Sequence, residues 1–357
     1  MKIAIVTLTK GANYGNRLQN YAVENVLKGI GCRAVTLISD FRFADIDALH
    51  RCWYLLKRAF KISNYNYTYR QLRFAKFNDQ LLSYSGASNA NIDSFDYVVY
   101  GSDQIWNTHF EASVVADFSF LFGETVPKRK KVAYSASVGT GDIPEEYKKR
   151  IAKALRDFRS ISVREEQAAS IICELTGRKV PVTIDPTLML DAADWQRIEK
   201  KPHYVHKNEK ILLTYFLGDL SPARKAFVDA VAQQFGLRVV ALQNEWVKDI
   251  PDPAVYATTP DEFIWLVHHC QLMLTDSFHG SVFSILFDKP FRCFGREESG
   301  VADMSSRMDT LFGKFGIGDW CRGSVQEDPD HIFYKDYVSV PAVLERCLLY
   351  TSDAADD

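Results

Sequence analysis

The stretch that decides how the whole chain folds is Leu274-Thr275-Asp276-Ser277-Phe278-His279-Gly280-Ser281. The mostly apolar run 271–274 predicts a short buried strand, and the apolar run 282–287 predicts the interior of a helix. A strand that ends in a polar turn and opens a helix is typical of an α/β sheet, where ligands bind at the carboxyl ends of the strands. Because the first backbone N–H groups of a helix favour an anion, this turn predicts an anion site that His279 can contact.

The same alternation of strands and helices continues along the chain. A strand at 2–8, a loop rich in Gly and Asn and a helix at 17–28 lead to a strand at 33–39, which makes a right-handed βαβ unit. Further strands are expected at 96–100, 131–137, 160–166, 181–185, 210–217, 237–243 and 291–294. Further helices are expected at 144–158, from the end of the strand at 160–166 to about 175, and at 222–235, 259–270 and 303–315. The fold class is therefore α/β, with two Rossmann-like domains of parallel strands that face each other across a cleft.

The predicted domain boundaries follow changes in composition. Residues 1–190 form the N-terminal domain, with a helical insertion at about 45–85, and residues 205–346 form the C-terminal domain. The charged stretch 190–209 lacks periodicity and is the predicted linker. The tail 347–357 resembles the in-frame translation of a sequencing-library adapter, and we expect that it does not belong to the fold.

Composition excludes several classes of protein. The chain has 357 residues and a net charge of −2, which is no global attraction for nucleic acid. Its seven cysteines include no CxxC pair, which predicts neither a zinc site nor a disulfide framework and favours a reducing compartment. The adjacent His268 and His269 have no evident further ligand, so no metal site is predicted there either. No run approaches the roughly 18 apolar residues of a membrane span, and the apolar start is too short for a signal peptide. We therefore expect a cytoplasmic protein.

The segment 51–77 combines many aromatic residues with basic ones and contains no acid. The basic residues are Arg51, Lys57, Arg58, Lys61, Arg70, Arg73 and Lys76. One interpretation is the solvated face of an amphipathic helical insertion. The other is a patch that contacts an anionic membrane surface or a lipid-diphosphate acceptor.

Polar side chains gather where the predicted strands end, in both halves of the chain. They include Asn13, Tyr14, Asn16, Ser102, Asp103, Gln104, Ser135, Ser137, Arg164, Asp219, Ser277 and His279. Because the carboxyl ends of parallel strands lie at one edge of a sheet, we expect these side chains to line one crevice.

Each main candidate has a structural alternative. His279 could act as a general acid/base beside an anion, which a pKa near ~6.5 suits, or it could cap a helix. Arg164 could bind phosphate or carboxylate through paired donors, or form a surface ion pair with the acids that follow it. Asp103 could be a base for a sugar hydroxyl or a helix N-cap, and Trp106 could stack on a sugar ring or pack in the core. Asp185, which precedes a proline, is interpreted as a structural turn former.

Five motifs, taken in order, resemble the polysaccharide pyruvyl transferase family. They are Asn13-Tyr14-Gly15-Asn16-Arg17-Leu18-Gln19-Asn20-Tyr21-Ala22, Gly101-Ser102-Asp103-Gln104-Ile105-Trp106-Asn107, Ser162-Val163-Arg164-Glu165, Asp185-Pro186-Thr187 and Thr275-Asp276-Ser277-Phe278-His279-Gly280. The resemblance covers nearly the whole chain to about residue 320. It implies a fold like that of GT-B glycosyltransferases, phosphoenolpyruvate as the donor, and a sugar of a cell-surface glycan, lipid-linked or polymeric, as the acceptor.

The resemblance also implies roles for individual residues. His279 is the expected catalytic histidine and Arg164 a donor-binding arginine, with the helix start at Ser277, Gly280 and Ser281 also on the donor side. Asp103 is expected to orient or deprotonate the acceptor hydroxyl. The N-terminal domain is expected to bind the acceptor through Asn13, Asn16, Ser102, Gln104, Trp106 and Asn107.

One position departs from the family pattern. Some members have an arginine two residues before the histidine, and here that position is Ser277. A second arginine for the donor must then come from elsewhere, with Arg17, Arg292 and Arg296 as candidates, or hydroxyls and helix N–H groups must hold the donor.

The predicted function is a transfer of the enolpyruvyl group of phosphoenolpyruvate onto a glycan as a pyruvate ketal, in capsule or exopolysaccharide biosynthesis. The scheme requires no cofactor and no metal, and it allows a peripheral position at the inner face of the plasma membrane. Two other classes remain as alternatives on the same architecture: a nucleotide-sugar-dependent GT-B glycosyltransferase, and a non-catalytic glycan-binding protein.

Overall fold

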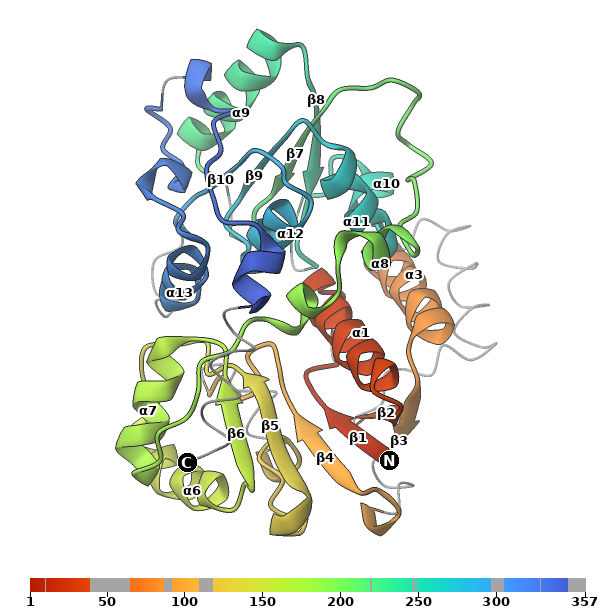
Figure 1. Cartoon of the computed structure of the whole chain (residues 1–357). Coiled ribbons are helices and arrows are strands. Elements are labelled where there is room, and N and C mark those ends of the chain that lie inside the picture. The colour runs from red at the N-terminus through yellow and green to blue at the C-terminus, as the bar shows by residue number, and fades with distance from the viewer. Residues whose placement is uncertain are drawn as a thin grey trace.

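The computed structural model describes residues 1–9, 11–38, 65–86, 92–108, 118–218, 220–245, 247, 249–296, 305–327 and 329–345. These residues form two α/β halves that lie one above the other, each built on its own parallel sheet (Figure 1). The predicted α/β class with two Rossmann-like domains is therefore confirmed.

The sheet of the first half has six parallel strands in the order β3-β2-β1-β4-β5-β6. They are β1 (Lys2–Val6), β2 (Arg33–Ile38), β3 (Tyr84–Gly86), β4 (Tyr97–Tyr100), β5 (Lys131–Ala136) and β6 (Ser160–Val163). The order reverses between β1 and β4, and a crevice opens at such a switch point, beyond the carboxyl ends of the two strands. The loops that follow β1 and β4 carry the polar motifs at residues 13–16 and 102–104.

Helices cover this first sheet and bring its loops to the crevice. They are α1 (Tyr14–Gly29), α3 (Tyr65–Leu81), α5 (Phe118–Leu121), α6 (Glu145–Arg156) and α7 (Glu166–Thr176), with 3-10 turns η1 (Ile92–Ser94), η2 (Lys128–Lys130) and η3 (Pro186–Met189). The side chain of Asn13 caps α1 by accepting a hydrogen bond from the backbone N of Asn16 at 3.2 Å. Gly177 ends α7 in the left-handed conformation, with φ 76°, that glycine adopts without strain.

The sheet of the second half has four parallel strands in the order β10-β9-β7-β8. Its elements are β7 (Ile211–Tyr215), α9 (Pro222–Phe235), β8 (Arg238–Leu242), α10 (Pro253–Tyr256), α11 (Pro260–His269), β9 (Leu272–Thr275), α12 (Phe278–Leu286), β10 (Phe291–Cys293), α13 (Ser305–Phe315), η4 (Asp319–Cys321) and η5 (Pro329–His331). The stretch 272–286 is a strand, a two-residue turn and a helix, as its sequence predicts, and it lies beside the switch point between β7 and β9.

A continuous apolar core joins the two halves. The ring of Tyr14, at the start of α1, stacks on Phe263 of α11 with centroids 4.9 Å apart, and Tyr215 of β7 meets it edge-on at 5.3 Å. Each such ring is fully buried, which is worth about 1.5–3 kcal/mol relative to exposure. The halves are therefore packed against each other along α1 and do not merely face each other across a cleft.

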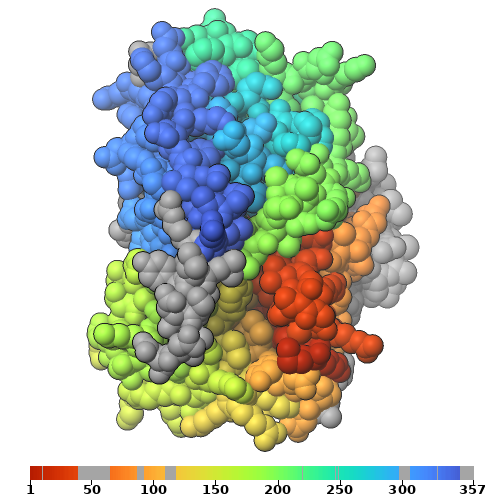
Figure 2. Space-filling model, viewed as in Figure 1, coloured from red at the N-terminus to blue at the C-terminus, as the bar shows by residue number. Residues whose placement is uncertain are grey.

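The linker takes part in this junction. The predicted linker 190–209 contains a short helix, α8 (Ala192–Gln196), which Asp191 caps. Its Trp195 is fully buried against Phe283 of α12 and Tyr21 of α1, with ring centroids 5.0 and 5.5 Å apart. Figure 2 shows the linker (green) lying directly against α1 (red) at the waist of the molecule.

The helix α3 corrects the interpretation of the basic segment. Arg70 is fully buried and donates to the backbone oxygens of Tyr256 and Ala12, and Arg73 forms a 2.7 Å ion pair with Glu262. Both side chains therefore bind residues of the second half. For Arg70 and Arg73, neither the interpretation as a solvated helix face nor that as a membrane-contacting patch is correct. Residues 51–64 lie outside the described part of the chain.

Two further sequence predictions differ from the structure. Residues 181–185 do not form a strand, because only one bridge, from Val163 to Val182, joins them to the first sheet. The short elements β3 and α10 were not predicted, since three or four residues carry too little periodicity to detect. Among the described residues, no helix is both long and apolar enough to span a bilayer.

Candidate active site

Arg164 lies at the centre of a buried charge network. It follows β6 directly, where its Nη1 donates to Asp185 Oδ2 at 2.5 Å and its Nη2 donates to Asp103 Oδ1 at 3.0 Å. Burial alone would lower the pKa of Arg164, but the charges of Asp185 and Asp103 raise it above its ordinary value. The alternative of a surface ion pair is wrong about exposure, because Arg164 is buried. Glu165 does pair with it, at 3.8 Å, but its closer partners are the buried carboxylates of two other loops.

Asp185 has a larger part than its sequence context indicated. Its Oδ1 accepts hydrogen bonds from the backbone N and hydroxyl of Thr187 at 3.0 and 2.6 Å, which caps η3 as a turn former would. Its Oδ2 faces Arg164 and lies 3.7 Å from Nε2 of His279. Burial is the largest single effect and raises the pKa of Asp185, but Arg164, His279 and the hydrogen bonds from Thr187 together outweigh it and lower the pKa. Asp185 is thus an anion that joins the arginine to the histidine.

Glu165 fixes the neighbouring loop. Its Oε1 accepts three hydrogen bonds, from the hydroxyl of Ser137 and from the backbone N of Val138 and Gly139, at 2.9, 2.9 and 3.1 Å. Its other oxygen lies 3.8 Å from Nε of Arg164. The loop after β5 and the residue after β6 are therefore held in one fixed geometry.

His279 occupies the first turn of α12 and faces the first half of the molecule. Its side chain is buried, and its Nε2 has no hydrogen-bond partner although Asp185 is near. Burial lowers the pKa of His279 and outweighs the carboxylates of Asp185 and Asp103, so the free protein holds a neutral imidazole at pH 7. An unpartnered ring nitrogen in a buried polar site is available to accept or deliver a proton.

Gly15 allows this close approach of α1 to the histidine. A Cβ atom at Gly15 would lie 2.1 Å from Nδ1 of His279, so the start of α1 packs directly on the imidazole. The first turn of α1, in the first half, and the first turn of α12, in the second half, therefore meet at His279.

This contact gives a prediction on stability. Gly15→Ala should lower the free energy of unfolding by about 1–3 kcal/mol, because the added methyl group must displace the imidazole or the helix. Urea unfolding measures the change. The matched control is Gly29→Ala at the other end of α1, where no atom lies within 4 Å and helix propensity predicts a gain of up to about 1 kcal/mol. Equal effects of the two substitutions would contradict the close packing of Gly15 on His279.

Arg307, from α13, is a second buried arginine that the sequence did not indicate. Its Nη1 lies 3.9 Å from Asp103 Oδ1. The guanidinium groups of Arg164 and Arg307 lie 4.5 and 5.8 Å from the centre of the Phe278 ring. Burial, and then the charge of Arg164, lowers the pKa of Arg307 to about 10, so it remains charged at neutral pH. No local motif marks Arg307, because only the folded chain brings α13 to Asp103.

A small cleft between the halves adjoins these two arginines. Residues that line it include Arg164, Asp185, Phe278, Arg307 and Lys314. Three cations and one carboxylate on its walls favour an anionic ligand. The same arginines disfavour a cation beside Asp103 and Asp185.

Two of the three arginines proposed from the sequence have other partners, and the third, Arg296, stays a candidate. Arg17 donates to the backbone oxygens of Thr9 and Gly11 and supports the loop after β1. Arg292 pairs with Glu327 at 2.6 Å. Arg296 follows β10, and its charge acts on Asp276 and Arg307. Arg307 is buried, and the charge of Arg164 lowers its pKa, so the two guanidinium groups are neighbours.

In the turn that opens α12, the side chains expected to bind the donor already make hydrogen bonds and contacts within the protein. The hydroxyl of Ser277 accepts a hydrogen bond from the backbone N of Gly280 at 3.4 Å and so caps α12. Gly280 packs closely on Thr275, and Ser281 is buried with its hydroxyl 3.4 Å from the backbone oxygen of Ser277. Ser277 therefore shapes the turn that presents His279.

The predicted acceptor residues divide into two groups. Asn13, Asn16 and Ser102 lie at the switch point between β1 and β4, where Gln19 joins the two loops by accepting a hydrogen bond from the backbone N of Ser102 at 3.0 Å. The second group, Gln104, Trp106 and Asn107, turns inward. The Nδ2 of Asn107 donates to Oε1 of Gln104 at 2.8 Å, and Trp106 is 1% exposed.

Trp106 corrects the expectation of a sugar-stacking platform. Its ring packs on Phe122 and Phe158, with centroids 6.0 and 5.6 Å away, and its indole N–H points to the backbone oxygen of Leu121 at 3.4 Å. The structure thus favours the core-packing alternative. Asp103 does not cap a helix in the described structure and is instead paired with Arg164.

Comparison with known families identifies the chain. The model of the family described as polysaccharide pyruvyl transferase matches residues 13–298, which is most of the chain. This chain belongs to the polysaccharide pyruvyl transferase family. It is therefore a transferase, and the family implies a glycan acceptor.

Solved structures of similar arrangement share little sequence with this pyruvyl transferase family member. UDP-GlcNAc 2-epimerase from Neisseria meningitidis bound to UDP-GlcNAc is 12% identical, with a TM-score of 0.43 over 98% of this chain and 100% of that one. Arabidopsis thaliana UGT89C1 complexed with UDP-L-rhamnose is 10% identical, with a TM-score of 0.48 over 97% and 92%. E. coli ADP-heptose lps heptosyltransferase II is 11% identical, with a TM-score of 0.39 over 99% and 100%. No curated protein matches the chain.

Proposed function

We propose that this member of the polysaccharide pyruvyl transferase family transfers the enolpyruvyl group of phosphoenolpyruvate to two hydroxyls of a glycan sugar. One hydroxyl oxygen loses its proton and bonds to C2 of the donor, while the C2–C3 double bond becomes single and C3 gains a proton. The second hydroxyl oxygen then bonds to C2 as the C2–O bond to phosphate breaks, and its proton is released. The products are a pyruvate ketal and inorganic phosphate.

A single observation carries the proposal. His279 presents an unpartnered Nε2 near two buried arginines, and these arginines line a cleft whose charged side chains are three cations and one carboxylate. A donor that carries a phosphate and a carboxylate matches this charge, and an imidazole at its edge can move a proton to or from C3. Asp185 would keep the ring oriented, because it is itself fixed by Arg164 and Thr187.

In this proposal, Arg307 provides the second donor-binding guanidinium group that some family members carry at the position of Ser277. Both nitrogen termini of the Arg164 guanidinium already bind carboxylates, and its Nε has no hydrogen-bond partner. Arg307 lies 3.9 Å from Asp103 and lines the same cleft, so its positive charge faces the space that a phosphate or carboxylate would enter. The two arginines would then bind the donor's phosphate and carboxylate, and no neutral hydroxyl would be required to bind these groups.

The acceptor would lie along the first half, at the loops of Asn13, Asn16 and Ser102. Asp103 borders both the acceptor loops and the donor arginines, so it can orient the attacking hydroxyl.

We further propose a cytoplasmic role in capsule or exopolysaccharide biosynthesis, with a peripheral membrane contact limited to the basic residues of 51–64.

The proposal is tested by ligand-induced thermal shift and by phosphate release. Phosphoenolpyruvate should raise the melting temperature, and phosphate should appear only when donor and a glycan acceptor are both present. Stabilisation by UDP- or GDP-sugars instead of phosphoenolpyruvate would favour a nucleotide-sugar glycosyltransferase. Binding of glycan with no phosphate release from any donor would favour a non-catalytic glycan-binding protein.

Arg307 gives a more specific prediction. Arg307→Met should raise the dissociation constant for phosphoenolpyruvate about 10- to 100-fold, because a charge-assisted hydrogen bond in a buried site is worth about 1.5–3 kcal/mol. Isothermal titration calorimetry measures the constant. The control is Arg322→Met, which removes an exposed arginine paired with Asp309 and should leave donor affinity unchanged. Equal affinities in wild type and Arg307→Met would remove Arg307 from the donor site.

A further inference from the structure

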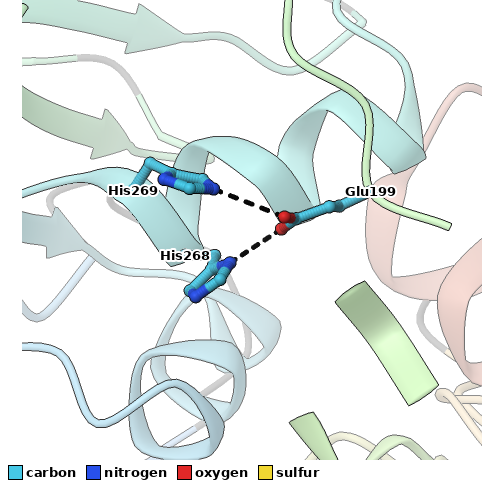
Figure 3. A group of neighbouring side chains, drawn as sticks. All are labelled: Glu199, His268 and His269. Atoms are coloured by element: carbon cyan, nitrogen blue, oxygen red, sulfur yellow. Dashed lines mark hydrogen bonds and ion pairs between the residues drawn. The ribbon is translucent and has the colours of Figure 1, made fainter. Parts of the chain in front are cut away.

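A second group of reactive side chains lies at the surface, away from the cleft. Glu199 of the linker meets His268 and His269 at the end of α11 (Figure 3). Nδ1 of His268 lies 2.8 Å from one carboxylate oxygen of Glu199, and Nε2 of His269 lies 3.3 Å from the other. These residues lie at the amino end of β9, whereas His279 lies beyond its carboxyl end, so the group is separate from the active site.

Neighbouring side chains hold both rings in place. His268 stacks on Phe287 with centroids 4.8 Å apart, and His269 stacks on Trp265 at 4.3 Å. The amide of Gln196, in α8, lies 3.3 Å from Nε2 of His268, the ring nitrogen that does not face Glu199. As a donor, this amide nitrogen orients the ring and leaves the proton on Nδ1, facing Glu199, and a metal ion that binds Nδ1 would displace that proton. The two rings and the carboxylate are therefore preorganised before any ion arrives.

We propose that Glu199, His268 and His269 form a binding site for a divalent transition-metal ion of the Zn²⁺ class. With metal–nitrogen and metal–oxygen bonds of about 2.0–2.2 Å, ligand atoms of a tetrahedral site lie roughly 3.3 Å apart. The three ligand atoms here all lie within 4.8 Å of one another, so side-chain rotations alone can close the site.

The donor set and its position decide the kind of ion. Two imidazole nitrogens and one carboxylate oxygen suit Zn²⁺, Co²⁺ or Ni²⁺, whereas Mg²⁺ and Ca²⁺ prefer oxygen ligands only. Both histidines lie in the last turn of α11, where the backbone carbonyl groups favour a cation. Because the side chain of His269 is 42% exposed, solvent can complete the coordination.

A bound ion would connect the linker to the second half. Glu199 follows α8, and the histidines belong to α11, which also packs against α1 of the first half. The site would therefore clip the linker to the helix at the junction and stabilise the fold without taking part in proton transfer at His279. Sequence spacing could not reveal it, because Glu199 is about 70 residues from the histidines in the chain.

The test uses the full chain stripped of metal with a chelator. Titration with Zn²⁺ should show one saturable site, and excess Zn²⁺ should raise the melting temperature by at least about 2 °C, since an ion that binds only the folded state stabilises it. The His268→Gln/His269→Gln double variant and the Glu199→Gln variant should lose both effects. His206→Gln, which removes an exposed histidine outside the group, should keep them.

Two results would overturn the site. One is the absence of saturable binding to the wild-type protein, which would leave the three residues as a hydrogen-bonded cluster only. The other is unchanged binding in the double variant, which would place the ion elsewhere. Co²⁺ absorption of the wild-type protein adds a readout that does not depend on variants: thiolate charge-transfer bands would assign the ion to cysteines, and their absence beside tetrahedral d–d bands would support this site.

Discussion

His279→Ala should lower kcat for phosphate release from phosphoenolpyruvate and acceptor by about 10²–10⁴-fold, the usual contribution of a positioned general acid/base. The imidazole is buried beside Asp185, and its Nε2 has no hydrogen-bond partner. Steady-state phosphate release measures kcat, and circular dichroism checks that the fold is kept. His203→Ala, at an exposed position of the linker, is the control and should behave as wild type.

The protonation of His279 gives this prediction a direction in pH. In the free protein, burial lowers the pKa of His279 below its ordinary value near 6.5, so the neutral form is lost only as pH falls below that range. A bound dianion should raise this pKa, because the imidazolium gains a negative neighbour. NMR titration of the imidazole with and without phosphoenolpyruvate measures both values. Wild-type turnover of His279→Ala, or a pKa that the donor leaves unchanged, would contradict the proposed role.

Arg164→Ala should lower the free energy of unfolding by about 3–5 kcal/mol, which is the cost of leaving buried charges without their partner. Its removal would strand the carboxylates of Asp103 and Asp185, which are 5% and 2% exposed. Chemical denaturation at pH 7 measures the change. The loss should become smaller as pH falls, since protonation neutralises the stranded carboxylates.

A surface arginine provides the comparison. Arg150→Ala breaks a bidentate ion pair with Glu124 that is partly exposed to solvent. Exposed ion pairs of this kind contribute about 1 kcal/mol or less to the free energy of unfolding. Arg164→Lys should fall between the two alanine variants, because one ammonium group cannot reach both carboxylates as the guanidinium does. A loss for Arg164→Ala no larger than that for Arg150→Ala would refute the buried network.

The parts of the site that the sequence predicted are those set by local structure. A polar residue directly after a buried strand must lie at the sheet's carboxyl edge, and this alone brought Asp103, Arg164 and His279 together. Trp106 shows the limit of the rule. It follows the same strand, but its large apolar ring is most stable inside, and its position in sequence does not say which way the side chain turns.

The residues that were missed have roles that depend on the folded chain. Asp185 is a turn former through one oxygen, as its sequence indicates, while the other oxygen meets Arg164 across 21 positions. Arg307 has no local signal at all. Arg70 and Arg73 were assigned to a basic surface because the acceptors that neutralise or bind them belong to the other half of the chain.

The aromatic junction limits how this enzyme can move. Rotating one half away from the other would expose the rings of Tyr14, Phe263 and Trp195 to water, and relative domain motion is the default only where such an interface is small or polar. A clamshell opening about the linker is therefore unfavourable. We therefore expect ligands to exchange while the two halves stay packed against each other.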